Sequence, residues 1–213
     1  MIAAQVLVRQ ETTTKQQEEF KEKQMNASKP LVPRLIPMKS WVLPKGHMGR
    51  TGIKMPKLLG VTIHDTGNTN KGSNALANCR YVHRDCINKK LSFHLCVDDK
   101  QAVILVPLDE TAYHGSNRIA NTQTIGIEIC VASDMDLMKS HDNAAMLTAW
   151  ILKNIMKIPI GTDISKYLFT HRYWIERSGN KQSKICPYQM LVRNNPYSWS
   201  TFVRKVNSFF IGR

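Results

Sequence analysis

Three predicted strands each place one reactive side chain on the less apolar of their two faces. Successive side chains of a strand point to opposite faces, so a polar residue between aliphatic neighbours faces away from them. The strands and their reactive residues are 58–64 with His64, 91–97 with His94, and 124–132 with Glu128. In the second strand, the same alternation groups Phe93 with Leu95 on the apolar face. A lone carboxylate is costly to bury, so we expect Glu128 to face a groove or a partner.

Two further residues can complete a metal site. His171 follows Phe169 and Thr170, and Cys186 lies in the sequence Lys184-Ile185-Cys186-Pro187. Zinc binds imidazole nitrogen and thiolate sulfur, and a catalytic zinc has three protein ligands and one water. His64, His171 and Cys186 form such a set. Taken singly, each is more commonly a structural residue, so only the combination indicates a metal.

The elements that must hold these residues alternate between strands and helices. Helices are predicted over 73–86, 140–156 and 198–210, and Pro159 limits the second of them. Residues 91–97 and 102–108 are expected to form a hairpin across the Asp98-Asp99-Lys100 turn. Strands that alternate with helices on both sides of a sheet predict an α/β or α+β domain over residues 58–213.

The chain before residue 58 differs from the rest. Residues 1–28 form an extension in which Thr14 and Gln17 can cap a short exposed helix. Residues 29–57 are rich in proline and glycine, with several lysines and arginines and no acidic residue. This irregular segment is either a basic arm that holds an anionic polymer or a stretch of chain that packs on the surface of the domain before entering it.

Charge and composition narrow the class of protein. The 213 residues carry a formal net charge of +14, which favours an anionic partner such as nucleic acid, membrane or cell wall. We find no recognised nucleic-acid-binding motif, no stretch long enough to span a membrane and no signal peptide. The five cysteines are an odd number without regular spacing, so we expect thiols.

Five short motifs follow one another in a recognisable order. They are Val61-Thr62-Ile63-His64-Asp65-Thr66-Gly67-Asn68, Ser92-Phe93-His94-Leu95-Cys96-Val97-Asp98-Asp99, Ala112-Tyr113-His114-Gly115, Thr124-Ile125-Gly126-Ile127-Glu128-Ile129-Cys130, and His171 followed by Lys184-Ile185-Cys186-Pro187. Over residues 57–192 the sequence resembles the zinc-dependent N-acetylmuramoyl-L-alanine amidase family, which includes phage endolysins and animal peptidoglycan recognition proteins. It looks closest to the amidases of Bacillus, Clostridium and their phages. Residues 1–28 have no counterpart in this pattern.

The resemblance implies a fold and a set of roles. The fold is a mixed central sheet flanked by helices, with zinc (Zn²⁺) in a groove on one face. His64 and His171 match the imidazole ligands and Cys186 the thiolate ligand. Glu128 matches the glutamate that takes a proton from the zinc-bound water, and Lys184 matches the lysine that steadies the charged intermediate.

Two other positions, His94 and His114, match the wall of the groove. Together with Asn117, which could contact the glycan or the stem peptide, they are candidate substrate-binding residues. A structural role stays open for each of them.

The resemblance also implies an activity and a place of action. The enzyme would cut the amide between N-acetylmuramic acid and the L-alanine of the stem peptide, so that a phage or prophage endolysin lyses bacteria. It would be made in the host cytoplasm and act on the wall after release. We expect a monomer, and we expect its basic surface to hold anionic wall polymers. Two alternatives stay open. One is a peptidoglycan-binding protein without catalysis, against which Cys186 and Lys184 argue; the other is a basic nucleic-acid-binding or regulatory protein.

Overall fold

A computed structural model describes residues 36–179 and 181–212 of the chain. The extension 1–28, with its predicted helix, lies outside the described residues. The described chain as far as Ile211 belongs to one compact unit. Its strands are β1 Met38–Ser40, β2 Arg50–Lys54, β3 Gly60–Asp65, β4 Leu95–Val97, β5 Ala102–Ile104, β6 Glu110–Ala112, β7 Thr124–Ile129 and β8 Leu168–Thr170. Its helices are α2 Ala75–Asp85, α3 Arg118–Gln123, α4 Leu137–Trp150, η1 Ile151–Ile155, η2 Ile164–Tyr167, α5 His171–Arg177, η3 Gln189–Arg193 and α6 Trp199–Ile211.

Six strands form the main sheet in the order β1-β5-β4-β7-β3-β8. All neighbouring pairs are parallel except β4 and β5, which form the predicted antiparallel hairpin. β7 is one of the two middle strands and pairs with β3, and the register of this pair places His64 directly beside Glu128. β2 and β6 form a separate antiparallel pair. The mixed sheet confirms the predicted fold class.

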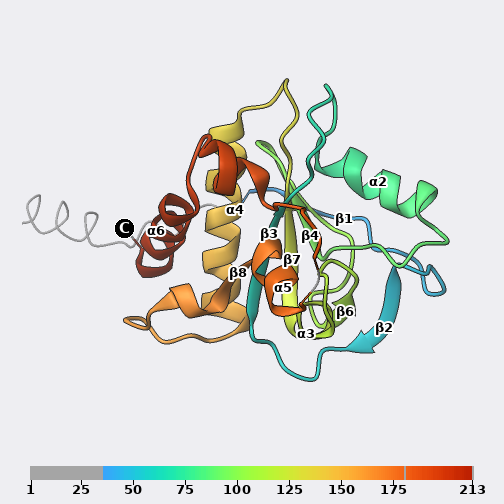
Figure 1. Cartoon of the computed structure of the whole chain (residues 1–213), viewed down its shortest axis with the longest axis horizontal. Coiled ribbons are helices and arrows are strands. Elements are labelled where there is room, and N and C mark those ends of the chain that lie inside the picture. Colours follow the sequence, from blue (N-terminus) through green and yellow to red (C-terminus); the bar gives the residue numbers. More distant parts are fainter. Residues whose placement is uncertain (1–35, 180, 213) are drawn as a thin grey trace, which may run out of the picture. The chain divides into compact units, whose positions relative to one another are not determined.

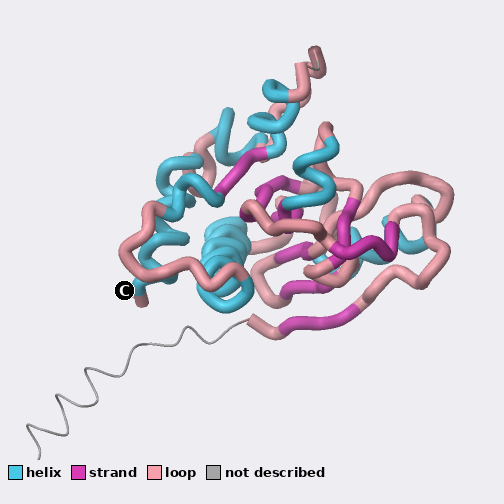
Figure 2. Tube along the Cα trace, turned by 90° about the horizontal axis from the view of Figure 1, so that it is seen from below, coloured by secondary structure: helices cyan, strands magenta, loops and turns pink. Residues whose placement is uncertain are grey.

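Helices cover both faces of the main sheet (Figure 1). On one face, α4 and α6 pack against the buried aliphatic residues of β3, β4 and β7. On the other face, α2 packs against a second buried cluster that includes Cys96 and Cys130. Figure 2 shows the strands grouped between these helices. His64 and Glu128 alternate with the residues of the first cluster, so they belong to the second face. No described helix has both the length and the apolar character needed to cross a bilayer.

The predicted elements agree with the observed ones, with two corrections. Phe93 packs in the cluster beside α2, whereas Leu95 packs in the cluster beneath α4. The alternation predicted for residues 91–97 fails there because the strand begins only at Leu95. In addition, part of the segment expected to be irregular forms β1 and β2. β1 has only three residues, too few for a periodic pattern to be recognised.

The aliphatic residues of β7 lie in the buried core. Ile127 is fully buried, whereas Ile53 in β2 is 63% exposed. We expect Ile127→Ala to lower the free energy of unfolding by about 2–5 kcal/mol, because the lost side chain leaves a cavity in a close-packed core. Ile53→Ala is the matched control and should change it by less than about 0.5 kcal/mol. Urea denaturation measures both, and equal effects would contradict this placement of the core.

Candidate metal centre and active site

Three residues far apart in the sequence converge on one buried point. The candidate ligand atoms of His64, His171 and Cys186 all lie within 4.8 Å of one another, and all three residues are buried. It is the only such group of three among residues 36–179 and 181–212. The structure therefore brings together the three residues that the sequence suggests as metal ligands.

The strand β3, which lies between β7 and β8, positions His64. The neighbouring inward residue Thr62 is held on both sides: its hydroxyl accepts a hydrogen bond from the Trp174 indole at 2.9 Å and lies 2.7 Å from the hydroxyl of Thr124. Trp174 lies in α5, so this bond ties the helix that carries His171 to the strand that carries His64. The distance between the two imidazoles is thereby set by packed elements rather than by loops.

His171 is the first residue of α5. Thr170 caps the helix, because its hydroxyl accepts a hydrogen bond from the backbone N–H of Tyr173 at 3.0 Å. The imidazole Nε2 lies 2.7 Å from the hydroxyl of Ser116. Nδ1 of the same ring is buried and has no hydrogen-bond partner among the described residues. A buried ring nitrogen without a partner is unfavourable unless it binds something, so this atom is suited to be a metal ligand.

Two backbone contacts hold Cys186 beside the histidines. The N–H of Arg172 donates to the carbonyl of Cys186 at 3.0 Å, which ties it to the first turn of α5. The N–H of Gln189 donates to the carboxylate of Asp65 at 2.8 Å, which ties the following residues to the end of β3. Cys186 Sγ then lies 3.8 Å from Nδ1 of His64.

The donor set and its spacing fit zinc. Tetrahedral ligands at about 2.0 Å for nitrogen and 2.3 Å for sulfur are separated by about 3.5 Å, close to the observed sulfur–nitrogen distance of 3.8 Å. Burial keeps the pKa of His64 well below its usual range, as do the neighbouring histidines and Lys184, so the ring is neutral as a ligand must be. Burial raises the pKa of the Cys186 thiol, which a bound cation would reverse.

Glu128 faces the same site from the adjacent strand. It stands beside His64 in the parallel register, and its Oε2 is buried without a hydrogen-bond partner in the part of the chain that the structure describes. Burial raises the pKa of Glu128 to about 8, although the positive charge of Lys184 opposes the shift. A carboxylate whose pKa lies near neutrality is suited to exchange protons with a substrate or water.

Lys184 is exposed at the rim of the site. Its side chain lies outside the core, yet its charge lowers the pKa values of His64, His171 and Glu128. The ammonium group is therefore close enough to act electrostatically on all three side chains. It is a cation beside a buried carboxylate and a potential metal, where negative charge would develop in a hydrolytic reaction.

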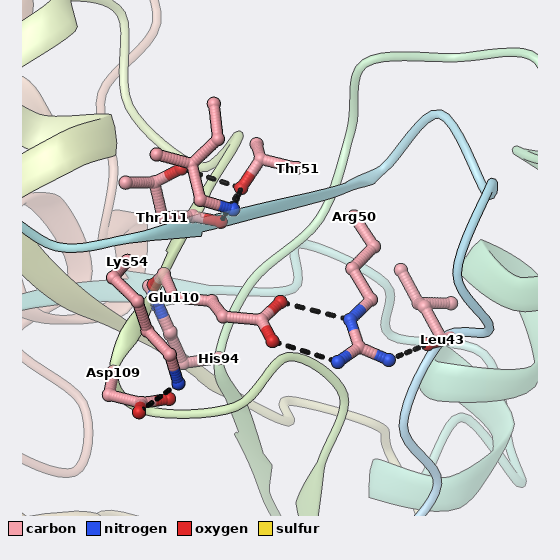
Figure 3. A network of polar contacts seen from close by, with 9 residues as sticks. Leu43, Arg50, Thr51, Lys54, His94, Asp109, Glu110 and Thr111 are labelled. Atoms are coloured by element: carbon pink, nitrogen blue, oxygen red, sulfur yellow. Dashed lines mark hydrogen bonds and ion pairs between the residues drawn. The ribbon is translucent and has the colours of Figure 1, made fainter.

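The three predicted substrate-binding residues are all engaged by the protein itself. His94 is completely buried, and its Nε2 lies 2.8 Å from the carbonyl of Glu110, which Figure 3 shows beside it. Its Nδ1 accepts a hydrogen bond from the N–H of Gly126 at 2.9 Å. His114 is buried, and its Nδ1 lies 3.1 Å from Nε2 of His64. Asn117 caps α3 and donates to the carbonyl of Trp174 at 3.1 Å. These contacts fit the structural alternative for each residue, and contact with a substrate stays a prediction.

Several supporting residues were missed by sequence reasoning. Ser116 and Thr62 hold ligand-bearing elements, and the side-chain oxygen of Asn121 accepts from the backbone of His114 at 3.0 Å and Gly115 at 2.6 Å. Ser116 and Thr62 act through hydrogen bonds to residues far away in the sequence, which no local spacing reveals, whereas the two Asn121 contacts are local. The only local signal is that Ser116 and Asn121 follow the motif containing His114.

Comparison with known proteins identifies the family of the chain. A model of the N-acetylmuramoyl-L-alanine amidase family matches residues 54–189. The amidase CwlH of Bacillus subtilis (strain 168) is 29% identical over 180 residues, which cover 82% of this chain and 62% of CwlH. The amidase XlyA of the same strain is 32% identical over 154 residues, which cover 70% of this chain and 46% of XlyA. The aligned part is thus less than two thirds of either relative.

The fold is likewise similar to a solved structure. The catalytic domain of XlyA superposes with a TM-score of 0.66 at 30% sequence identity, covering 80% of this chain and 99% of that domain. The family match over residues 54–189 includes the elements that carry the site.

Proposed function

Since this chain belongs to the N-acetylmuramoyl-L-alanine amidase family, we propose that it is a zinc-dependent peptidoglycan amidase. The bond cut is the amide between the lactyl group of N-acetylmuramic acid and the L-alanine of the stem peptide. One observation carries the proposal: His64, His171 and Cys186 converge within 4.8 Å beside the unpartnered carboxylate oxygen of Glu128.

Zinc held by His64, His171 and Cys186 would lower the pKa of a water molecule and polarise the amide carbonyl. Glu128 then accepts the proton of the attacking water and returns it to the leaving amine. Its burial and its raised pKa suit both steps, because the carboxyl group exchanges a proton near neutral pH. His64 and His171 stay neutral, since burial lowers the pKa of both rings.

Lys184 stabilises the oxyanion that develops on the amide carbonyl. We expect Lys184→Met to lower kcat by about 100-fold, as for the loss of one donor to an oxyanion, and to leave zinc binding intact. Lys181→Met removes a nearby exposed cation and is the matched control. Initial rates on a soluble muropeptide measure both variants. Equal rates for Lys184→Met and the control would exclude this role.

The products identify the bond that is cut. Purified protein is incubated with washed bacterial cell walls, and the released ends are assayed. An amidase generates new N-terminal alanine and no new reducing sugar. New reducing ends would indicate a glycosidase, and N-terminal residues other than alanine would indicate a peptidase.

Three further expectations accompany the proposal. The enzyme acts on the wall as an endolysin, it works as a monomer, and its net charge of +14 holds it on anionic wall polymers. If charge provides wall retention, binding to walls falls steeply as salt is raised. Binding that does not change with salt would contradict retention by charge, and it would leave the amidase proposal in place.

A further inference from the structure

The surroundings of His114 fix its imidazole ring in one orientation. The ring lies flat on β7 at Gly126, where a Cβ atom would come within 2.5 Å of the ring carbon Cγ and 2.8 Å of Nδ1. The backbone of His114 is held by the side-chain oxygen of Asn121 at 3.0 Å. Only glycine at position 126 leaves room for the ring. The ring therefore has little freedom to rotate or to exchange its two nitrogens.

Hydrogen bonding then decides which nitrogen of His114 carries the proton. Nε2 lies 3.1 Å from the carbonyl oxygen of Thr124, and a carbonyl can only accept. The ring is buried, which favours its neutral form, so it has a single N–H group. That group is Nε2–H, and Nδ1 carries a lone pair.

The position of the proton on His114 in turn determines which nitrogen of His64 is protonated. Nδ1 of His114 lies 3.1 Å from Nε2 of His64. Because this Nδ1 has no hydrogen, Nε2 of His64 must donate. A neutral His64 that donates from Nε2 keeps its lone pair on Nδ1, the atom that lies 3.8 Å from Cys186 Sγ.

A second buried histidine, His94, holds the backbone of Gly126, against which the His114 ring packs. His94 donates from Nε2 to the carbonyl of Glu110 at 2.8 Å, so its Nδ1 accepts from the N–H of Gly126 at 2.9 Å. Glu110 is itself held by Arg50 through two hydrogen bonds at 2.9 and 2.8 Å (Figure 3). The chain of contacts runs from this ion pair through His94 and Gly126 to His114.

We infer that His114 is a positioning residue that fixes the proton of His64 on Nε2 and presents Nδ1 for zinc. The inference rests on the zinc site of the proposed function. It assigns His114 no contact with the substrate. It also gives Gly126 a specific role, because a side chain at that position would displace the ring.

Zinc affinity and histidine NMR test this role together. In His114→Phe the flat ring is kept and the acceptor is lost, so we expect zinc to bind about 10- to 100-fold more weakly, as for other residues that orient a ligand. His114→Asn restores an acceptor close to the position of Nδ1 and should recover most of the affinity. Competition with a chromophoric chelator measures the affinities.

Long-range ¹H–¹⁵N spectra of the metal-free protein report the tautomers directly. We expect His64 and His114 of the wild type to carry their protons on Nε2, and His64 to lose this single tautomer in His114→Phe. His141→Phe is the control, because His141 is a buried histidine of α4 whose Nδ1 lies 2.7 Å from the Leu137 carbonyl, away from the metal site. It should bind zinc like the wild type.

Two results would overturn the inference. One is a folded His114→Phe that binds zinc as tightly as the wild type. The other is a wild-type spectrum with the His64 or His114 proton on Nδ1, which needs no variant to fold. Both differ from failure of the proposed amidase function, which would appear as a wild-type protein that releases no N-terminal alanine from walls.

Discussion

Replacing Cys186 by serine is expected to remove zinc from the protein and reduce amide hydrolysis to background. Cys186 supplies the only thiolate of the three converging side chains, and a serine hydroxyl is a poor zinc ligand at neutral pH. We expect zinc affinity to fall by more than about 100-fold, since losing a ligand costs more than losing a residue that orients one. Zinc content after dialysis and initial rates on cell walls measure the two effects.

The loss of a buried thiol must be separated from the loss of a ligand. Cys86 is also fully buried, at the end of α2 and outside the metal site. Cys86→Ser should lose some stability and keep zinc at one equivalent. If Cys186→Ser retained zinc and wild-type activity in zinc-replete buffer, Cys186 would not be a ligand.

Glu128→Gln is expected to keep zinc and lose turnover. The amide has nearly the shape of the carboxyl group, so it fits beside His64, but it cannot accept a proton. Removing a general base costs about 100- to 10,000-fold in rate, and we expect the loss in kcat rather than in KM. Steady-state kinetics on a soluble muropeptide, with zinc content measured on the same samples, test this separation.

Glu176→Gln provides the matched control for this substitution. Glu176 is an exposed glutamate of α5 that pairs with Arg172. Its replacement should change kcat only slightly. Loss of metal from Glu128→Gln would show instead that Glu128 helps to bind the ion, and unchanged kcat would remove it from the catalytic mechanism.

Strand periodicity accounts for the part of the site that could be predicted from residues alone. Alternation in two long, buried strands places His64 and Glu128 on the same face, and the parallel register of β3 and β7 sets them side by side. The same reasoning was wrong for Phe93, where the chain is not yet a strand. Alternation is thus informative only within the true bounds of a strand.

The convergence of the metal ligands could not be predicted from spacing. Cys186 lies 122 residues after His64. It is positioned by the hydrogen bond from the Arg172 N–H to its own carbonyl and by the one from the Gln189 N–H to the Asp65 carboxylate. These bonds depend on the path of irregular chain, for which the sequence has no periodic signal. For this part of the site, the resemblance to a family identified the residues, and the structure supplies the physical reason that they meet.

The hydrogen bonds that His94 and His114 make near the metal ligands could not be predicted from the sequence either. His94 and His114 were expected in the groove wall, yet both are buried and bonded to the protein. Their match to the family's groove wall suggested contact with a substrate. The role that we infer for His114 depends on which nitrogen carries a proton, which follows from the positions of backbone carbonyl groups.

The central claim is that zinc held by this chain drives amide hydrolysis in cell walls. The most direct measurement follows release of N-terminal alanine from washed walls by the full chain, first stripped with a chelator and then supplied with zinc. We predict that release stops when the metal is removed and returns as one equivalent of zinc is restored, with no new reducing sugar at any stage. Undiminished release from the fully stripped protein, or no release despite one bound zinc on several wall types, would contradict the account.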